Sequence, residues 1–98
     1  MVKHVIIWKL KNDLENPAAQ TGAIKNELEA LVGKIDGLLE MKIHTNPFPC
    51  SAGDIMMDSV FVSKQALDDY QKHPLHQAIA KNVVRPAVEQ RLSFDYEI

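Results

Sequence analysis

Residues 2–10 read Val-Lys-His-Val-Ile-Ile-Trp-Lys-Leu, and their side chains alternate between two faces, as in a β-strand. One face carries His4, Ile6, Trp8 and Leu10, and the opposite face carries Lys3, Val5, Ile7 and Lys9. Apolar side chains thus occupy both faces, which is typical of a strand that is covered on both sides. We expect helices to cover one face of this strand and a second sheet to cover the other.

A helix is predicted directly after this strand. Asn16 is suited to cap a helix, and Pro17 is suited to open its first turn. Apolar residues then recur at the spacing of one helical stripe, which consists of Ile24, Leu28, Leu31, Val32 and Ile35. The pair Asp36-Gly37 is expected to close this helix.

Residues 38–45 alternate again and predict a strand that is buried on one face only, as at the edge of a sheet. We expect its buried side chains to be Leu39, Met41 and Ile43. His44 lies on the polar side, where it is expected to meet solvent or the rim of a dimer. Residues 46–53 are rich in turn formers and predict a loop.

The second half of the chain predicts a strand, an interrupted helix and a last strand. Ser63 is suited to cap a short helix that runs through Tyr70. Because the residue before a proline is driven away from helical geometry, His73 is expected at a bend, and Pro74 opens a second segment. That segment is expected to run through about Val84. The two predicted strands are residues 55–62 and 88–98.

This order of elements is the split βαβ arrangement called ferredoxin-like, an α+β fold with an antiparallel sheet. It predicts a single domain over residues 1–98. If helices cover one face, the other face presents apolar side chains to water, namely Val5, Ile7, Val60 and Val62. Soluble monomers rarely expose a contiguous apolar patch. We therefore expect a twofold homodimer whose sheets pack face to face, forming a dimeric α/β barrel.

Composition and charge exclude several classes of protein. The formal net charge of -2 supplies no cationic surface, so no nucleic-acid partner is expected. Cys50 is the only cysteine and cannot form an intramolecular disulfide, which fits a reducing compartment. The apolar stretch after Met1 is too short for a membrane span and lacks the features of a signal peptide. A cytoplasmic protein with no membrane contact is the resulting expectation.

Three clusters of residues carry a resemblance to a known family. They are Lys3-His4-Val5, Asp69-Tyr70-Gln71-Lys72-His73-Pro74-Leu75-His76 and Phe94-Asp95-Tyr96. In this order, and spread over nearly the whole chain, they resemble the stress-responsive dimeric A/B-barrel (Dabb) family. The resemblance implies a ferredoxin-like protomer, a homodimer and an association with stress responses in plants.

One branch of that family comprises plant polyketide cyclases, which close a linear polyketide by an intramolecular aldol reaction without a cofactor. The resemblance assigns the catalytic roles to Tyr70 and His76. It also implies a small apolar or aromatic ligand, for which we expect the binding residues to be His4, Ile6, Trp8, Leu28, Met57, Ser59, Phe61 and His73. The predicted first helix departs from the cyclases, because it presents Ile24 and Leu28 where they present aromatic residues. The same aromatic-forming substrate is therefore not expected.

Aldol-type ring closure requires a base that removes a proton next to a carbonyl and a donor that stabilises the resulting enolate. A neutral imidazole suits the first task and a phenol hydroxyl the second. His76 falls in the first turn of the segment opened by Pro74, where the positive helix end disfavours imidazolium. In the alternative interpretation, Tyr70 and His76 only stabilise the bend, by hydrogen bonds to each other or to nearby carbonyl groups.

Other candidate site residues also have structural interpretations. Those that fit a plain core as well as a pocket wall are His4, Trp8, Met57 and Phe61. His73 and His76 lie at helical spacing, but two ligands make no zinc site, so neither a metal nor a cofactor is predicted. Asp95 is expected to anchor the end of the chain through a hydrogen bond to its carboxylate.

Three functions agree with these observations. The first is a cofactor-independent enzyme of cyclase or lyase type that uses Tyr70 and His76. The second is a non-catalytic, stress-associated or ligand-binding dimer. The third, a cofactorless monooxygenase, rests only on other dimeric ferredoxin-like barrels, because no feature of the sequence favours oxygen chemistry.

Overall fold

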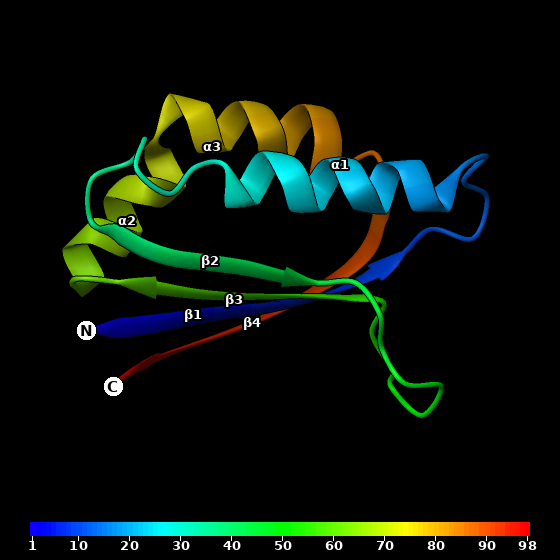
Figure 1. The fold of residues 1–98 in the computed structure, drawn as a ribbon, viewed down its shortest axis with the longest axis horizontal. Coiled ribbons are helices and arrows are strands. Elements are labelled where there is room, and N and C mark those ends of the chain that lie inside the picture. Colours follow the sequence, from blue (N-terminus) through cyan, green and yellow to red (C-terminus); the bar gives the residue numbers. More distant parts are fainter.

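The computed structural model describes all of residues 1–98. Its elements follow the predicted order and consist of β1 (Val2–Leu10), α1 (Pro17–Glu29), β2 (Leu38–His44), β3 (Ile55–Phe61), α2 (Lys64–Lys72), α3 (Pro74–Ile79), a π-helical turn η1 (Ala80–Val84) and β4 (Val88–Glu97). The four strands form one antiparallel sheet in the order β2-β3-β1-β4, and the helices lie on one of its faces (Figure 1). The predicted ferredoxin-like βαββαβ fold is confirmed.

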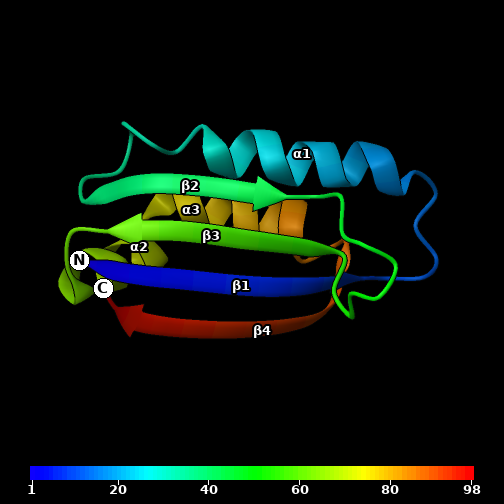
Figure 2. The ribbon, with the colours of Figure 1, turned by 60° about the horizontal axis from the view of Figure 1, so that its bottom comes forward.

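The core lies between the helices and the sheet face that carries His4, Ile6 and Trp8 of β1. All three are buried, as are Ile24 and Leu28 of α1. We call this side of the sheet the helical face. The opposite side, the open face, carries no helix, and Figure 2 looks onto it.

Helix α1 starts as predicted but ends earlier. The Asn16 side chain accepts a hydrogen bond of 3.1 Å from the backbone N–H of Ala19, and Pro17 is the first helical residue. The expected end at Asp36-Gly37 is wrong, because the helix ends at Glu29 and is followed by turns. Gly33 there has a φ of 89°, which helical backbone does not adopt.

The side chains after α1 do not share one helical stripe. Leu31 and Ile35 are buried from the turns, whereas Val32 is exposed. The helical pattern thus predicted the burial of Leu31 and Ile35 correctly, although neither residue lies in the helix.

Strand β2 is an edge strand, as predicted, but its start is irregular. The pairing with β3 shifts register between Leu38 and Glu40. Because of this bulge, Leu38 is buried and Leu39 is exposed, the reverse of the expectation for Leu39. On its free edge, the backbone N–H of Ile43 donates to the Glu29 carboxylate and the carbonyl of Ile43 accepts from the Lys25 ammonium, each at 2.9 Å. These side chains of α1 satisfy part of the open edge.

The bend between α2 and α3 forms as predicted. The Ser63 hydroxyl accepts a hydrogen bond of 3.1 Å from the N–H of Ala66 at the start of α2. His73 leaves the helix with an extended backbone, φ −67° and ψ 134°, and Pro74 opens α3. The His73 ring accepts from the N–H of Leu75 at 3.1 Å, so it caps α3.

The predicted composition of the open face needs correction. Val60 is only 7% exposed, because it lies in a central strand between Lys3 of β1 and Glu40 of β2. Val62 is exposed but lies past the end of β3. Strand pairing adds residues of β4 instead, since Val5 lies opposite Phe94 and Ile7 lies opposite Leu92.

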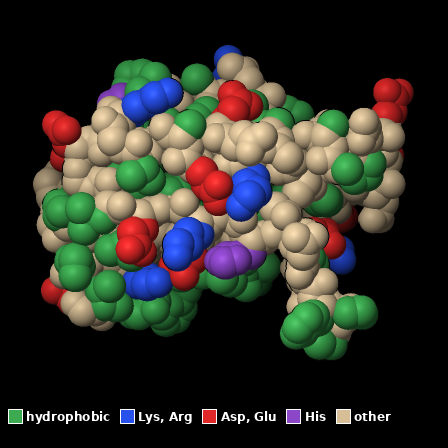
Figure 3. Space-filling view, viewed as in Figure 1, with side chains coloured by type: hydrophobic (Ala, Val, Ile, Leu, Met, Phe, Trp, Pro, Cys, Tyr) green, Lys and Arg blue, Asp and Glu red, His purple; other side chains and the backbone are tan.

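The loop between β2 and β3 projects from the open side of the sheet (Figures 1 and 3). Apolar side chains gather at its tip in Figure 3, and Phe48 is 78% exposed. Cys50 is also exposed in this loop.

Among the helices of the chain, none combines the length and apolar character that a membrane crossing requires.

Candidate active site

A cavity of about 490 Å³ lies between the helical face of the sheet and the helices. Strands β1, β3 and β4, all three helices and η1 contribute to its wall. The lining residues are His4, Ile6, Trp8, Leu28, Met57, Tyr70, Gln71, His76, Ala80, Val84, Arg85, Arg91 and Ser93. The apolar members from β1, β3 and α1 are buried and form its floor, whereas Arg85 and Arg91 are exposed. The cavity therefore has an apolar interior and a cationic, solvent-exposed part.

Tyr70 reaches this cavity from α2. Its ring is packed against Phe61 of β3, with ring centroids 5.0 Å apart, and the residue is 1% exposed. The hydroxyl oxygen is buried and has no hydrogen-bond partner within the protein. Burial raises the pKa of Tyr70 above its ordinary value, and the charge of Arg91 opposes this only in part. The phenol is therefore protonated near neutral pH and can donate a hydrogen bond.

His76 lies beside Tyr70 in the first turn of α3. The two ring centroids are 4.2 Å apart, with planes inclined by 38°. Its Nδ1 atom is buried and has no partner. Burial lowers the pKa of His76 below its ordinary value; a polar contact with the Gln71 backbone opposes this, and the charges of His4, Arg91 and Arg85 reinforce it. The imidazole is therefore neutral near pH 7, the state in which it can accept a proton.

The structural interpretation of the bend included a hydrogen bond from the Tyr70 hydroxyl to the imidazole or to a carbonyl group. No such bond of the hydroxyl is present, whereas His76 has a polar contact with the Gln71 backbone. The rings pack against each other while the hydroxyl and Nδ1 stay unpaired. Buried polar groups without partners are uncommon and call for an explanation.

Five of the expected binding residues line the cavity together with the tyrosine–histidine pair. They are His4, Ile6, Trp8, Leu28 and Met57. Three others do not line it. Phe61 lies behind the Tyr70 ring, the Ser59 hydroxyl donates to the His4 carbonyl at 2.7 Å, and His73 caps α3.

His4 combines the two roles that the sequence left open, since it is 1% exposed and also borders the cavity. Its Nδ1 forms a hydrogen bond with the Asp95 carboxylate of β4, directly opposite in the sheet. This contact holds the His4 ring and ties β4 to β1. It agrees with the predicted anchoring role of Asp95.

The cavity also contains polar residues that the sequence analysis missed, chiefly Arg85, Arg91 and Ser93. Arg91 lies opposite Trp8 and Ser93 lies opposite Ile6 in the pairing of β4 with β1. The alternation along residues 88–98 places Arg91 and Ser93 on the same side of the last strand. The sequence does not give the strand register, which turns this side toward the helices.

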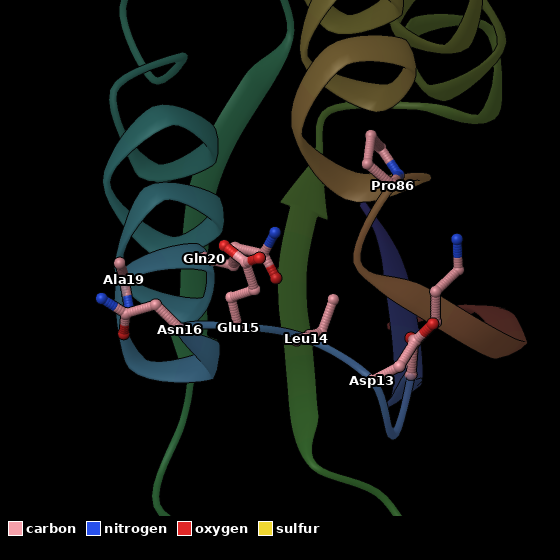
Figure 4. A pocket seen from close by; sticks show the side chains of 8 residues that line it. Asp13, Leu14, Glu15, Asn16, Ala19, Gln20 and Pro86 are labelled. Atoms are coloured by element: carbon pink, nitrogen blue, oxygen red, sulfur yellow. The ribbon is translucent and has the colours of Figure 1, made fainter.

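A second hollow lies between the loop before α1 and Pro86 (Figure 4). Asp13 and Leu14 of the loop and Asn16 and Gln20 of the α1 start line it. No histidine, tyrosine or arginine takes part, so it lacks the acid and base groups of the first cavity.

No group of three or more His, Cys, Asp or Glu side chains is placed to hold a metal ion.

Comparisons with known proteins agree with this architecture. A dimeric protein of unknown function with a ferredoxin-like fold from Bacteroides fragilis has a TM-score of 0.91 and 29% identity, with 99% of this chain and 95% of that chain covered. A Dabb family protein from Mesorhizobium loti has a TM-score of 0.79 and 20% identity, with 99% and 95% covered.

Hydroxynitrile lyase from Passiflora edulis has a TM-score of 0.83 and 22% identity, with 99% of this chain and 92% of that chain covered. At such identities the last two comparisons show the fold alone. No curated protein matches the sequence significantly. Residues 2–98 match the model of the family described as Stress responsive A/B Barrel Domain. The chain therefore belongs to the stress-responsive A/B barrel (Dabb) family.

Proposed function

We propose that this protein is a homodimeric, cofactor-independent enzyme of cyclase or lyase type. In this proposal it removes a proton from the carbon next to a carbonyl group of a small apolar or aromatic substrate. One observation carries the proposal: Tyr70 and His76 line the same cavity, and the phenol hydroxyl and one imidazole nitrogen of this pair are buried without partners. Side chains that line a cavity and hold unpaired polar atoms are candidates for contact with a substrate.

His76 is the base in this proposal. A C–H bond next to the substrate carbonyl breaks, its proton moves to the imidazole, and its electron pair moves onto the carbonyl oxygen to form an enolate. The enolate carbon then bonds to a second carbonyl carbon, and the new alkoxide takes the proton back from His76. The lowered pKa of His76 supports this role, because a base must be neutral at the working pH.

Tyr70 is the hydrogen-bond donor to the developing enolate oxygen. Its raised pKa keeps the phenol protonated, and the Phe61 ring behind it restricts its orientation. A fixed donor needs little reorganisation when charge develops, which is the main advantage of such groups in catalysis.

The remaining wall is suited to the apolar body of a small substrate. Ile6, Trp8 and Leu28 offer apolar contacts to the body of a small substrate. The same fold carries a hydroxynitrile lyase in Passiflora edulis, so lyase chemistry is compatible with this architecture.

The homodimer is part of the proposal. The Bacteroides fragilis relative is dimeric, and the open face of this chain exposes Leu92 and Phe94 at 73% and 70%. A second copy packed on this face would remove both side chains from water.

Proton exchange tests the proposed activity without knowledge of the natural substrate. Benzylacetone and benzylpyruvate each combine an aromatic body with a ketone, and loss of their protons next to the ketone in deuterated buffer is followed by NMR. We expect the wild-type protein to accelerate exchange of at least one probe. Tyr70→Phe and His76→Gln should each lower the catalysed rate by about a hundredfold or more.

Stability provides the control for this experiment. Because the Tyr70 hydroxyl has no partner, Tyr70→Phe should leave the free energy of unfolding unchanged or raise it slightly. Exchange in wild-type protein that is no faster than in buffer, or rates that both substitutions leave unchanged, would contradict the proposal. Binding of a probe without exchange would favour a ligand-binding protein instead.

A further inference from the structure

Arg85 and Arg91 are the only arginines in the chain, and both line the candidate active site. Neither forms a salt bridge or a side-chain hydrogen bond: the ion pairs of the molecule involve only lysines and His4 as cations. No Asp or Glu is among the residues that line the cavity. Two guanidinium groups therefore border the cavity without an acidic partner, in a chain whose formal net charge is -2.

The placement of these arginines follows from the fold. Arg91 lies in β4 opposite Trp8, and Ser93 follows on the same helical face. Arg85 comes directly after η1, whose residues Ala80 and Val84 form part of the wall. Both guanidinium groups are exposed, whereas the floor is buried. Asp95, the next residue of β4 on this face, is already bound to His4 and is not a partner for Arg91.

We propose that the ligand of this cavity carries a carboxylate, which Arg91 and Arg85 bind at the solvent-exposed end while the apolar body lies against Trp8. This assignment of the substrate class rests on the proposed function. Arginine is suited to the task because its planar group donates two parallel hydrogen bonds to a carboxylate. Unlike an exposed lysine, it also packs well beside apolar and aromatic groups.

The arginines would then act on the reacting groups as well as on binding. Their charges contribute to the lowered pKa of His76. A bound carboxylate offsets part of that effect, so it should raise the pKa of His76 in the complex relative to the free protein. This change is observable by NMR titration of the imidazole.

The two ketone probes form a matched pair, because benzylpyruvate differs from benzylacetone by a carboxylate in place of a methyl group. Their dissociation constants are measured by calorimetry on the wild-type dimer at two salt concentrations. We expect benzylpyruvate to bind about tenfold or more tightly than benzylacetone at low salt, as a charge-assisted hydrogen bond to a carboxylate allows. This preference should shrink as salt is added.

Substitutions then assign the preference to the arginines. Arg91→Gln and Arg85→Gln should each weaken benzylpyruvate binding, about tenfold for Arg91, and change benzylacetone binding less than about twofold. Lys34→Gln removes an exposed positive charge outside the cavity and should change neither. If Arg91→Gln does not fold, Arg85→Gln and the wild-type preference itself still decide the question.

The outcomes separate this inference from the proposed function. Equal affinity for the two probes, or no binding of benzylpyruvate at millimolar concentration, would overturn the carboxylate assignment even if benzylacetone exchanges its protons. A preference that depends on Arg91, without any exchange, would support the assignment and contradict the proposed catalysis.

Discussion

At the residue scale, the central feature is a pair of rings whose polar atoms are left unpaired. Tyr70 and His76 pack closely enough to restrict each other, yet neither satisfies the buried polar atom of the other. Leaving such atoms unpaired costs stability, on the order of 1–3 kcal/mol each. In the proposed function, a ligand in the cavity supplies the missing partners.

The candidate pair was predictable from the sequence only through the family resemblance. Residue types and spacing alone also allowed a structural hydrogen bond at the bend, and the structure shows that the Tyr70 hydroxyl forms none. Ser59 and Phe61 share a strand face with Met57, but the cavity does not extend to them. The place of Arg91 in the cavity wall could not be predicted, because it depends on the register between β4 and β1. The alternation along one strand does not contain this register.

Titration of His76 predicts a dependence of stability on pH. The folded pKa of His76 is lowered, so between that value and the ordinary value of 6.5 the unfolded chain binds more protons than the folded protein. The contribution of His76 to the free energy of unfolding is therefore fully present above about pH 6.5 and is lost as the pH falls toward the folded pKa.

Chemical denaturation at pH 7.5, 6.5 and 5.5 measures this effect. One protein concentration is used throughout, because the stability of the proposed dimer would depend on concentration. We expect the wild-type protein to lose more stability than His76→Gln between the highest and the lowest of these pH values. Parallel losses in the two proteins would show that His76 is not the group that titrates.

At the element scale, the strongest local patterns were predicted correctly. Asn16 and Ser63 cap their helices, and Pro74 separates α2 from α3 at the expected position. The errors lie at element ends. The turns after α1 bury Leu31 and Ile35, as a continued helix was expected to do, so periodicity did not reveal that the helix had ended.

Gly37 offers a test of how the turn after α1 fits against α2. Its φ is 84°, and a Cβ atom added there would lie 2.6 Å from the Ala66 Cβ atom. Gly37→Ala should lower the free energy of unfolding by about 2 kcal/mol or more, since it adds both backbone strain and a clash. Chemical denaturation measures this change.

Gly22→Ala is the matched control, because Gly22 lies inside α1 with nothing within 4 Å of an added Cβ atom. This substitution should raise the free energy of unfolding by up to about 1 kcal/mol, from helix propensity alone. If both substitutions had the same sign, the close approach at Gly37 would not be the constraint.

At the scale of the whole molecule, the chain divides its functions between the two faces of one sheet. The helical face holds the cavity, and the open face, on which no helix lies (Figure 2), holds apolar side chains such as Leu92 and Phe94. Apolar alternation on both faces of residues 2–10 predicted this division. It did not identify the most exposed apolar side chains of the open face, Leu92 and Phe94 of β4. Their place on this face depends on the pairing of β4 with β1.

The open face predicts the effect of charge on assembly. Leu92→Glu places a carboxylate at the most exposed apolar position of this face and should convert the proposed dimer into a monomer at micromolar concentration. Size-exclusion chromatography with light scattering measures the mass. Val32→Glu alters an exposed apolar residue in the turns after α1 and should leave the mass unchanged. A monomeric wild-type protein at that concentration would contradict the proposed dimer.

A double-mutant cycle on proton exchange tests most directly whether Tyr70 and His76 act together on one bound ligand. The catalysed exchange rate of benzylpyruvate is measured for the wild type, Tyr70→Phe, His76→Gln and the double variant, all at pH 7.5. Groups that stabilise one transition state are not additive, so the double variant should be no more than about tenfold slower than the slower single variant. Wild-type exchange that all three variants reproduce would contradict the account, because it would place the chemistry outside the tyrosine–histidine pair.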